Sequence, residues 1–177
     1  MKDKRLYFVG GAKGVGKSSL LREVSKQTGL LVVNTGDFFR EATQSYQNNV
    51  KEIAKKNIIL YFCESVPAIA DTHYAGFLDG IYNGRFERGL HQDELGLLAQ
   101  NVDLELILID LDPLILRERR IDDANNDRDH LFESIRKEIE ANRIYFDEYC
   151  LELGKKGVII ENIDFDDSLK QLCKLVK

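Results

Sequence analysis

A glycine-rich stretch that directly follows a short apolar run limits the possible folds of this chain more than any other feature. The apolar run covers residues 6–9, LYFV, and residues 10–19 follow it as GGAKGVGKSS. An apolar run of this length is typical of a buried strand, and the amphipathic pattern over residues 17–28 is typical of a helix. The stretch therefore joins a strand to a helix through a tight turn.

Four more short apolar runs alternate with longer amphipathic segments. The apolar runs cover residues 30–33, 66–70, 104–109 and 158–160. The further helical patterns cover residues 37–46, 50–64, 112–121, 130–153 and 166–176. Strands that alternate with helices predict a parallel sheet covered by helices on both faces. We therefore predict an α/β fold with a five-stranded parallel sheet, whose ligands bind at the carboxyl ends of the strands.

Size and charge agree with one globular domain. The 177 residues are 44% hydrophobic and 31% charged, and the formal net charge is −5. A chain of this length buries a substantial core, so we expect a single domain over residues 1–177. The acidic balance disfavours broad binding to nucleic acid. No apolar run approaches the roughly 20 residues that cross a bilayer, and we expect no membrane span.

The cysteines point to a reducing compartment. Cys63, Cys150 and Cys173 are widely spaced and form no CxxC pair. This usage disfavours a disulfide framework and a zinc site. A charged start followed by glycines also disfavours a secretory signal, so we expect a cytoplasmic protein.

Residues 11–18, GAKGVGKS, fit the pattern GxxxxGK[ST]. Its glycines let backbone N–H groups approach phosphate oxygens, and the following helix adds its N-terminal dipole. Lys17 supplies charge to the β- and γ-phosphates of ATP, and Ser18 supplies a hydroxyl to Mg²⁺. The predicted nucleotide contacts are Gly11, Ala12, Lys13, Gly14, Val15, Gly16, Lys17, Ser18 and Ser19. The alternative is a turn that only connects two elements, with Lys13 in solvent.

The segment after the second predicted strand, residues 34–40, reads NTGDFFR. It resembles the "TGD–hydrophobic pair–R" stretch of adenylate kinases and other nucleoside monophosphate kinases. The resemblance implies an acceptor-binding region at about residues 35–65, in which Thr35 and Gly36 contact the acceptor base and Arg40 its phosphate. Arg40 would lie one turn into the following helix, and an arginine there can bind phosphate through two parallel hydrogen bonds. Alternatively, Thr35 or Asp37 only caps a helix and Arg40 is solvated.

Asp71-Thr72-His73 follows the third predicted strand. An aspartate at the end of the strand beside a phosphate loop is where a Walker B acid holds Mg²⁺. Archaeal-type adenylate kinases carry a similar Asp-Thr-His, and the resemblance implies that Asp71 and Ser18 hold the metal. The alternative is that Asp71 caps a turn. His73 is given no proton-transfer role.

Residues 76–96 contain five glycines and read as a loop. Archaeal-type adenylate kinases have a "PGLP" turn in this region, whereas this chain has RGLH at residues 88–91 and lacks both prolines. Arg85 and Arg88 lie in the same stretch, and each is a candidate for the arginine that binds the acceptor phosphate in bacterial-type adenylate kinases. For each of them, a solvated arginine on a loop is the alternative.

The segment after the fourth predicted strand is rich in arginine and aspartate. It is similar to the short lid of archaeal-type adenylate kinases, "RR–x–x–D–x–x–R–x–RD", over about residues 117–130. The matching residues are Arg119, Arg120, Asp123, Arg128 and Asp129. The resemblance implies that Arg119, Arg120 and Arg128 are catalytic, because phosphoryl transfer needs positive charge on the migrating group. Asn126 stands where arginine is usual, and the alternative is an Arg/Asp-rich helix end held by local ion pairs.

Two further stretches resemble the same family. Asn142-Arg143 is similar to an "NR" pair in the long helix, where Arg143 either supports the site or only packs. Residues 161–164, ENID, stand where the family's adenine-binding loop would lie.

The resemblance implies a P-loop NTPase of the nucleoside monophosphate kinase type, which transfers the γ-phosphate of ATP to a monophosphate, first of all AMP, with Mg²⁺. Three alternatives stay open. One is a small-molecule hydroxyl kinase with Asp37 as the acceptor-side carboxylate. Another is a switch ATPase of ribosome assembly with a protein partner, and the third is a nucleotide sensor without turnover. The sequence leaves the acceptor base and the oligomeric state open.

Overall fold

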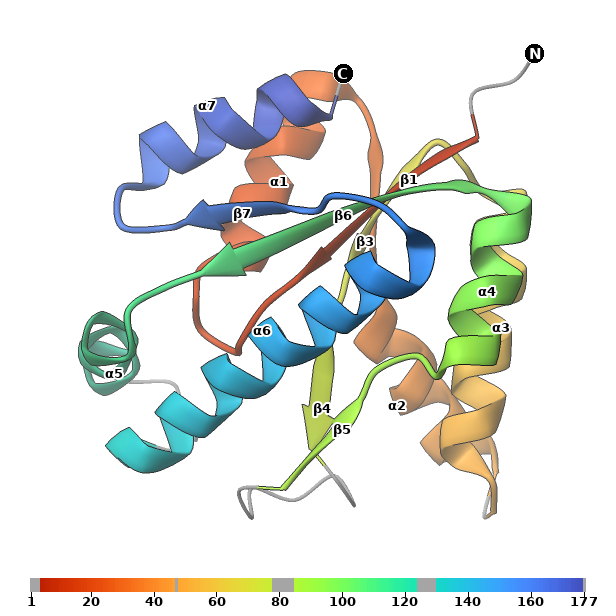
Figure 1. Ribbon diagram of the computed structural model, residues 1–177, viewed down its shortest axis with the longest axis horizontal. Helices are drawn as coiled ribbons and strands as arrows, with labels where there is room; N and C mark the ends of the chain where they lie inside the picture. The colour runs from red at the N-terminus through yellow and green to blue at the C-terminus, as the bar shows by residue number, and fades with distance from the viewer. Residues whose placement is uncertain (1–3, 47, 78–84, 124–129, 177) are drawn as a thin grey trace.

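Five parallel strands form the centre of the molecule. The computed structural model describes residues 4–46, 48–77, 85–123 and 130–176 (Figure 1). The strands lie in the order β2–β3–β1–β6–β7. Their bounds are Arg5–Gly10 for β1, Leu31–Asn34 for β2, Ala68–Asp71 for β3, Asp103–Asp110 for β6 and Val158–Glu161 for β7. Each of the five predicted strands is confirmed to within two residues.

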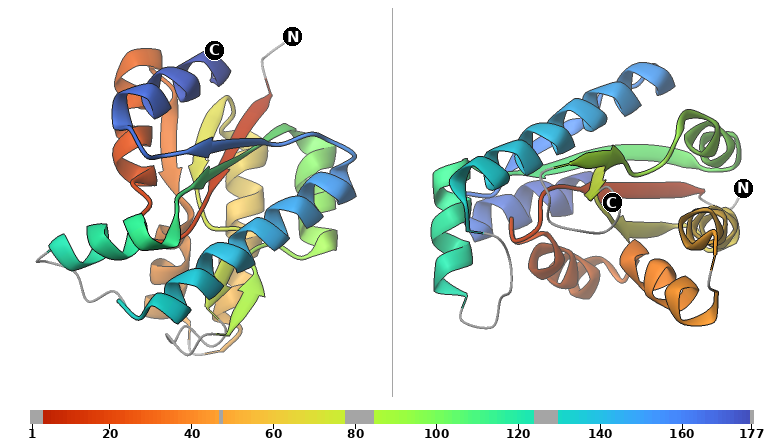
Figure 2. Two further views of the ribbon diagram at one scale, coloured as in Figure 1. Left: turned by 60° about the vertical axis from the view of Figure 1, so that its left-hand side comes forward. Right: turned by 90° about the horizontal axis from the view of Figure 1, so that it is seen from below.

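Helices cover both faces of this sheet, as the sequence predicts for a parallel sheet. In Figure 2, α1 and α7 lie on one face, and α4 and α6 lie on the other. The helices in chain order are α1 Lys17–Thr28, α2 Thr35–Ser45, α3 Val50–Glu64, α4 Gln92–Asn101, α5 Pro113–Asp122, α6 Phe132–Leu153 and α7 Phe165–Leu175. Helix α3 packs against both α2 and α4. Within the described ranges no helix is long and apolar enough to cross a membrane.

Alternate residues of the central strand build two separate hydrophobic cores. Leu6 and Phe8 of β1 pack into the cluster that includes residues of α3, α4 and α6. Tyr7 and Val9 pack into the cluster on the opposite face, with residues of α1 and α7. Successive side chains of a strand point to opposite faces, so a strand buried on both sides is apolar at every position. This explains why the central strands β1, β3 and β6 are mostly apolar in sequence.

The prediction of a continuous loop over residues 76–96 is wrong. Ala75–Phe77 (β4) and Phe86–Arg88 (β5) pair as antiparallel strands, and α4 begins at Gln92. Helix α4 starts with a capping box, in which the Glu94 side chain accepts from the backbone N–H of His91. Leu95 and Leu98 of this helix are buried, and Gly96 sits in the helix with open space beside it. One helical glycine costs only about 1 kcal/mol, which the capping and the buried leucines offset.

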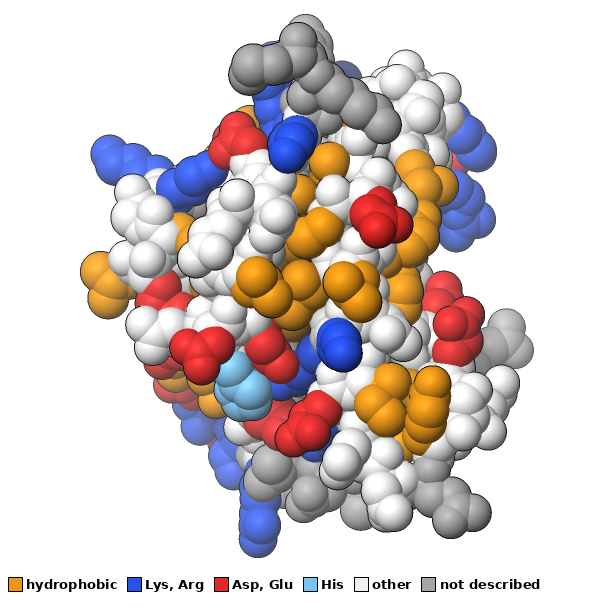
Figure 3. Space-filling model, turned by 90° about the vertical axis from the view of Figure 1, so that its right-hand side faces the viewer, with side chains coloured by type: hydrophobic (Ala, Val, Ile, Leu, Met, Phe, Trp, Pro, Cys, Tyr) orange, Lys and Arg blue, Asp and Glu red, His pale blue; other side chains and the backbone are white. Residues whose placement is uncertain are grey.

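The outer side of α3 and α4 is mixed in character. Figure 3 shows hydrophobic side chains along the middle of this side, with acidic and basic side chains next to one another around them. Leu60 of α3 and Leu97 of α4 are both about half exposed.

The strand register brings the chemically interesting loops to one edge of the sheet. Val9 of β1 pairs with Asp71 of β3, and Gly10 pairs with Leu108 of β6. The glycine-rich loop after β1 therefore lies between the ends of β3 and β6. This is the edge at which parallel sheets bind ligands.

Candidate active site

The glycine-rich segment between β1 and α1, residues 11–16, has a backbone that only glycine adopts readily; it is called the phosphate loop below. Gly14 and Gly16 have φ values of 86° and 91°. A Cβ on Gly16 would lie 2.5 Å from Nδ2 of Asn162, and one on Gly11 would lie 2.3 Å from the carbonyl oxygen of Ile109. Both the backbone conformation and the close packing therefore require glycine. Helix α1 then begins at Lys17, directly at the end of this loop.

A buried ion pair holds the phosphate loop from behind. Glu138 of α6 accepts from the backbone N–H of Lys13 at 2.7 Å, and its other oxygen lies 2.8 Å from Nη2 of Arg120. Arg120 also donates from Nη2 to the carbonyl oxygen of Lys13 at 2.6 Å. Arg120 and Glu138 are 1% and 3% exposed, so their charges are compensated inside the protein. Local sequence patterns do not indicate this role of Glu138, because the contact joins residues 125 positions apart.

The loop after β7 holds the phosphate loop from a second side. Asn162 donates from Nδ2 to the carbonyl oxygen of Val15 at 2.6 Å. Arg119 donates to the carbonyl oxygens of Asn162 at 2.7 Å and Val15 at 3.4 Å. Oδ1 of Asn162 is buried and has no hydrogen-bond partner within the described residues. Arg119 and the predicted adenine-binding segment are thus brought together beside the phosphate loop.

Lys17, Asp71 and Ser18 form a compact charged cluster. Nζ of Lys17 lies 2.7 Å from Oδ1 of Asp71, and Oγ of Ser18 donates to Oδ2 of Asp71 at 2.7 Å. Lys17 and Asp71 are both buried. A hydroxyl and a carboxylate are hard oxygen donors of the kind that Mg²⁺ binds, usually together with water and substrate phosphates. The donor set at Ser18 and Asp71 therefore fits Mg²⁺, and the phosphate loop with Lys17 fits a triphosphate.

Thr35 connects this cluster to the start of α2. Its hydroxyl lies 3.0 Å from Oγ1 of Thr72 and 3.3 Å from the carbonyl oxygen of Asp71. Neither Thr35 nor Asp37 caps the helix, contrary to the alternative interpretation of the sequence. The N-cap is Asn34, whose Oδ1 accepts from the N–H of Gly36 at 2.8 Å. Thr35 is therefore held at the end of β3 by side-chain contacts.

One cavity of about 740 Å³ connects the two halves of the site. On the donor side it is lined by the phosphate loop, Lys17, Ser18, Ser19 and Asp71. On the other side it is lined by Asn34, Thr35, Gly36, Phe39, Arg40, Lys51, Lys55, Ile58, Glu87, Arg88, Gly89 and Leu90. Arg40, which forms an ion pair with Asp37, is largely exposed. The sequence-based prediction missed Lys51, Lys55 and Ile58, although their i, i+4, i+7 spacing is the signal of one helix face.

Arg88 lines the cavity but is strongly engaged elsewhere. Its guanidinium donates to both carboxylate oxygens of Glu152 and, from Nε, to the carbonyl oxygen of Leu90 at 2.6 Å. It also lies over the ring of Tyr149, 4.5 Å from the centroid. The hydrogen bond to Arg88 lowers the pKa of Glu152, and the same bond raises the pKa of Arg88. Arg85, the other candidate, is exposed and is not among the residues that line the cavity.

The remaining candidates lie around the same edge. His73 lines the cavity, and its Nδ1 lies 2.6 Å from the carbonyl oxygen of Gly11. Arg143 donates from Nε to Asp110 at 2.7 Å. Asp123, the predicted lid acid, also lines the cavity, whereas Arg119 and Arg120 are not among its lining residues. Asn126, Arg128 and Asp129 fall outside the described residues.

Strand order, phosphate loop and the Lys17–Asp71–Ser18 cluster together define a P-loop nucleotide-binding domain with a kinase-type fold. A model of the family described as AAA domain matches residues 10–137, which is more than half of the chain. The chain therefore belongs to this family of P-loop domains.

Relatives of this chain include kinases. It is 28% identical to the adenylate kinase of Thermoplasma acidophilum over an alignment 172 positions long, and the match covers 87% of this chain and 87% of the other. Its fold is similar to that of the shikimate kinase from Acinetobacter baumannii in complex with shikimate, with a TM-score of 0.60 at 13% identity over 99% of this chain and 93% of the other. It is also similar to the YorR protein of Bacillus subtilis in complex with phosphorylated GDP, with a TM-score of 0.61 at 15% identity over 97% and 95% of the two chains. The predicted P-loop kinase fold is confirmed, and these comparisons support nucleotide-dependent phosphoryl transfer.

Proposed function

We propose that this protein transfers the γ-phosphate of ATP to a nucleoside monophosphate, with AMP as the first candidate acceptor and with Mg²⁺. The observation that carries the proposal is the shape of the cavity. A single space of about 740 Å³ has the phosphate loop at one end and cationic residues of α2, α3 and β5 at the other. Its volume is sufficient for small-molecule substrates, and phosphoryl transfer needs donor and acceptor in one water-excluding space.

The donor half would bind and orient ATP. Backbone N–H groups of the phosphate loop and Lys17 bind the β- and γ-phosphates, while Ser18 and Asp71 hold the metal. When bound, Mg²⁺ neutralises charge that develops on the phosphates. Lys17 then exchanges part of its contact with Asp71 for contact with phosphate. Its short, buried ion pair keeps the ammonium group at the mouth of the phosphate loop until that exchange.

The acceptor half favours an anionic acceptor over a neutral hydroxyl compound. Arg40 of α2 and two of the three lysines of α3, Lys51 and Lys55, line this part of the cavity, and Phe39, Ile58 and Leu90 give it an apolar wall. Asp37, the carboxylate that a hydroxyl kinase would use, is not among the lining residues and is paired with Arg40. A monophosphate is already anionic and needs charge neutralisation rather than a general base.

The arginines of the predicted lid complete the proposal. Arg119 contacts the backbone of the phosphate loop, and Arg120 is buried behind it. We assign Arg119 and Arg120 to positioning the phosphate loop around the transferring phosphoryl group, and Arg128 to charge stabilisation of that group. Thr35 and Gly36 contact the acceptor base in this scheme, and Arg40 contacts its phosphate. The spacing of the three cysteines in the sequence, with no CxxC pair, supports activity in a reducing compartment such as the cytoplasm.

The test is ADP formation from ATP and Mg²⁺ with and without each nucleoside monophosphate. We expect stimulation by at least one of them, with AMP tested first. Arg40→Met should raise the acceptor KM strongly, whereas Asp37→Asn should leave turnover largely unchanged. If no monophosphate stimulates ADP formation, or if shikimate or a sugar does so and Asp37→Asn abolishes turnover, the proposal fails.

A further inference from the structure

One face of helix α3 is turned toward the cavity. Lys51, Lys55 and Ile58 all line it, and they stand at positions i, i+4 and i+7 of the helix. Residues with this spacing lie above one another on one side of a helix. Ile58 is part of the hydrophobic core, and Lys51 is nearly half exposed, so Lys55 marks the boundary between core and solvent.

Lys55 is buried but only weakly paired. Its side chain is 8% exposed, and its partner within the described residues is Oε2 of Glu94 on α4, at 3.3 Å. That oxygen already accepts from the backbone N–H of His91 at 2.6 Å, as part of the capping box of α4. By comparison, Lys17, the other buried lysine of the cavity, lies 2.7 Å from its carboxylate. The contact of Glu94 with the helix cap is therefore shorter than its contact with Lys55.

A lysine ammonium group has three donor hydrogens, and burying it is costly unless charged or polar partners satisfy them. One long contact with a shared oxygen leaves most of that capacity for a group in the cavity. Neighbouring cations of the acceptor half are more fully engaged, as Arg88 is by Glu152. An anion beside α3 would therefore gain more from Lys55 than from Arg88.

We propose that Lys55 is a specificity-determining residue, which binds an anionic group of the acceptor and so selects anionic over neutral acceptors. This inference rests on the proposed function for the identity of the acceptor, a nucleoside monophosphate. Lys55 Nζ donates to an oxygen of the acceptor's phosphate and loosens its contact with Glu94. Charge-assisted hydrogen bonds of this kind are about twice as strong as neutral ones.

A purely structural role would make Lys55 a link between α3 and α4. The two roles differ in what the partner does. If Lys55 is only a link, removing the charge of Glu94 should have the same effect as removing that of Lys55. If Lys55 binds the acceptor, loss of the Glu94 charge should leave acceptor binding unchanged or make it tighter.

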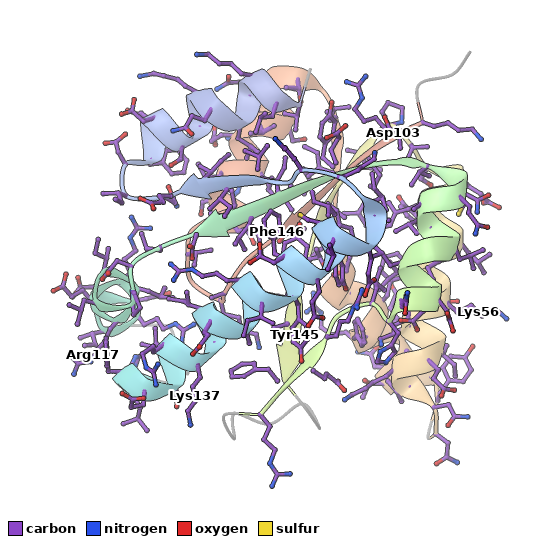
Figure 4. All side chains as sticks on the ribbon, viewed as in Figure 1. Lys56, Asp103, Arg117, Lys137, Tyr145 and Phe146 are labelled. Carbon is purple, nitrogen blue, oxygen red and sulfur yellow. The ribbon has the colours of Figure 1, made fainter. Side chains whose placement is uncertain are left out.

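The test measures binding of AMP and of inorganic phosphate by calorimetry, each with Mg²⁺ and a non-hydrolysable ATP analogue present. Lys55→Met should weaken AMP binding about 10- to 100-fold, the range expected for one lost hydrogen bond to a charged group. Lys55→Arg should restore part of it, and binding of the ATP analogue should not change. The matched control is Lys56→Met, one position along α3, where the side chain points into solvent (Figure 4).

Glu94→Gln is the decisive variant, because glutamine can still accept from the N–H of His91 and keep the helix cap. If Lys55→Met alone does not fold, the double variant Lys55→Met/Glu94→Gln replaces it, because it removes both charges of the pair and leaves neither one unpaired. The inference is overturned if Lys55→Met binds AMP as wild type does, or if Glu94→Gln weakens AMP binding as much as Lys55→Met. Turnover with monophosphates in that case would leave the proposed function standing. Conversely, if no monophosphate supports turnover but Lys55→Met still weakens phosphate binding, the proposed function fails and the anion site stands.

Discussion

Nζ of Lys17 lies 2.7 Å from Oδ1 of Asp71, and this contact joins the phosphate loop after β1 to the end of β3. Both side chains are buried, and the second oxygen of Asp71 is held by Ser18. Because the two charges compensate each other, both side chains are held in position before a ligand binds. Such a preorganised site can interact with a charged ligand without a large rearrangement. In the proposed function, the Asp71 carboxylate binds the metal and the Lys17 ammonium group binds the phosphates.

Lys17→Met should affect stability and turnover together. It leaves the buried Asp71 without its cation, so we expect the free energy of unfolding to fall by about 3 kcal/mol. Turnover should fall at least about 100-fold, because the charge on the β- and γ-phosphates is lost. Asp71→Asn leaves the buried Lys17 without its counter-charge, because the single amide oxygen can replace only one of the two carboxylate oxygens, so it should cost a similar free energy of unfolding and also raise the Mg²⁺ concentration needed for half-maximal activity. Urea unfolding and steady-state kinetics measure both effects, and full turnover by Lys17→Met would contradict this role.

Substitution of Arg120, which the sequence pattern places in the lid, should strongly lower stability because Arg120 forms a buried ion pair with Glu138. Arg120→Met leaves Glu138 buried and unpaired and removes two donors to the carbonyl oxygen of Lys13, so we expect the free energy of unfolding to fall by about 3–5 kcal/mol. Arg117 is exposed on the same helix (Figure 4). Arg117→Met should therefore change stability by less than about 0.5 kcal/mol. Equal melting temperatures for the two variants would contradict the buried arrangement.

Two glycine-to-alanine substitutions should have opposite signs. Gly16→Ala forces a Cβ into a backbone with φ of 91° and to within 2.5 Å of Asn162, so both stability and nucleotide binding should fall. Gly96 lies inside α4, and no neighbouring atom lies within 4 Å of the position that an alanine Cβ would occupy there. Gly96→Ala should therefore stabilise the protein by about 0.5–1 kcal/mol. Thermal unfolding of both variants checks the pair, and a stabilised Gly16→Ala would be inconsistent with the loop geometry.

Stability should depend on pH through Glu152. Arg88 lowers the pKa of Glu152 in the folded protein, so the folded state holds the ionised carboxylate more strongly than the unfolded chain does. Glu152→Gln should therefore cost about 1 kcal/mol at neutral pH, where Glu152 is ionised in both states. The difference should persist down to the unfolded pKa, about 4.3, and close as pH falls further through the folded pKa. Urea unfolding from pH 7 to pH 3 measures it, with Glu133→Gln on the exposed surface as the control, and a gap that widens in acid would have the wrong sign.

Much of the fold follows from local patterns in the sequence. The central strands β1, β3 and β6 are largely buried on both faces, so they are mostly apolar and can be recognised without their neighbours, whereas the edge strands β2 and β7 are partly exposed but still short and apolar. The sequence signal of the phosphate loop is equally local, since its glycines and Lys17 lie within eight consecutive residues, 11–18, where β1 connects to α1. The loop prediction for residues 76–96 failed because glycines outweighed a weaker signal, the capping box of His91 and Glu94 ahead of two buried leucines.

The contacts that hold the candidate site together are not local. Glu138 reaches the phosphate loop across 125 positions of the chain, and Asn162 reaches Val15 across 147. The sequence around either residue does not indicate such a contact, because a glutamate is common in helices and an asparagine is common in loops. Arg120 illustrates the same limit. The sequence identifies an arginine of the lid pattern, but only the packing of α5 on α6 makes it a buried partner of Glu138.

The most direct test of the proposed function is the phosphorus balance of the reaction, followed by ³¹P NMR with ATP, AMP and Mg²⁺. Transfer to the monophosphate consumes one ATP and one AMP for every two ADP formed and releases no inorganic phosphate. We expect this balance for the wild-type protein and its loss in Lys17→Met. Release of inorganic phosphate in step with ADP, with AMP unconsumed and with no other monophosphate able to replace it, would show an ATPase and contradict the proposal.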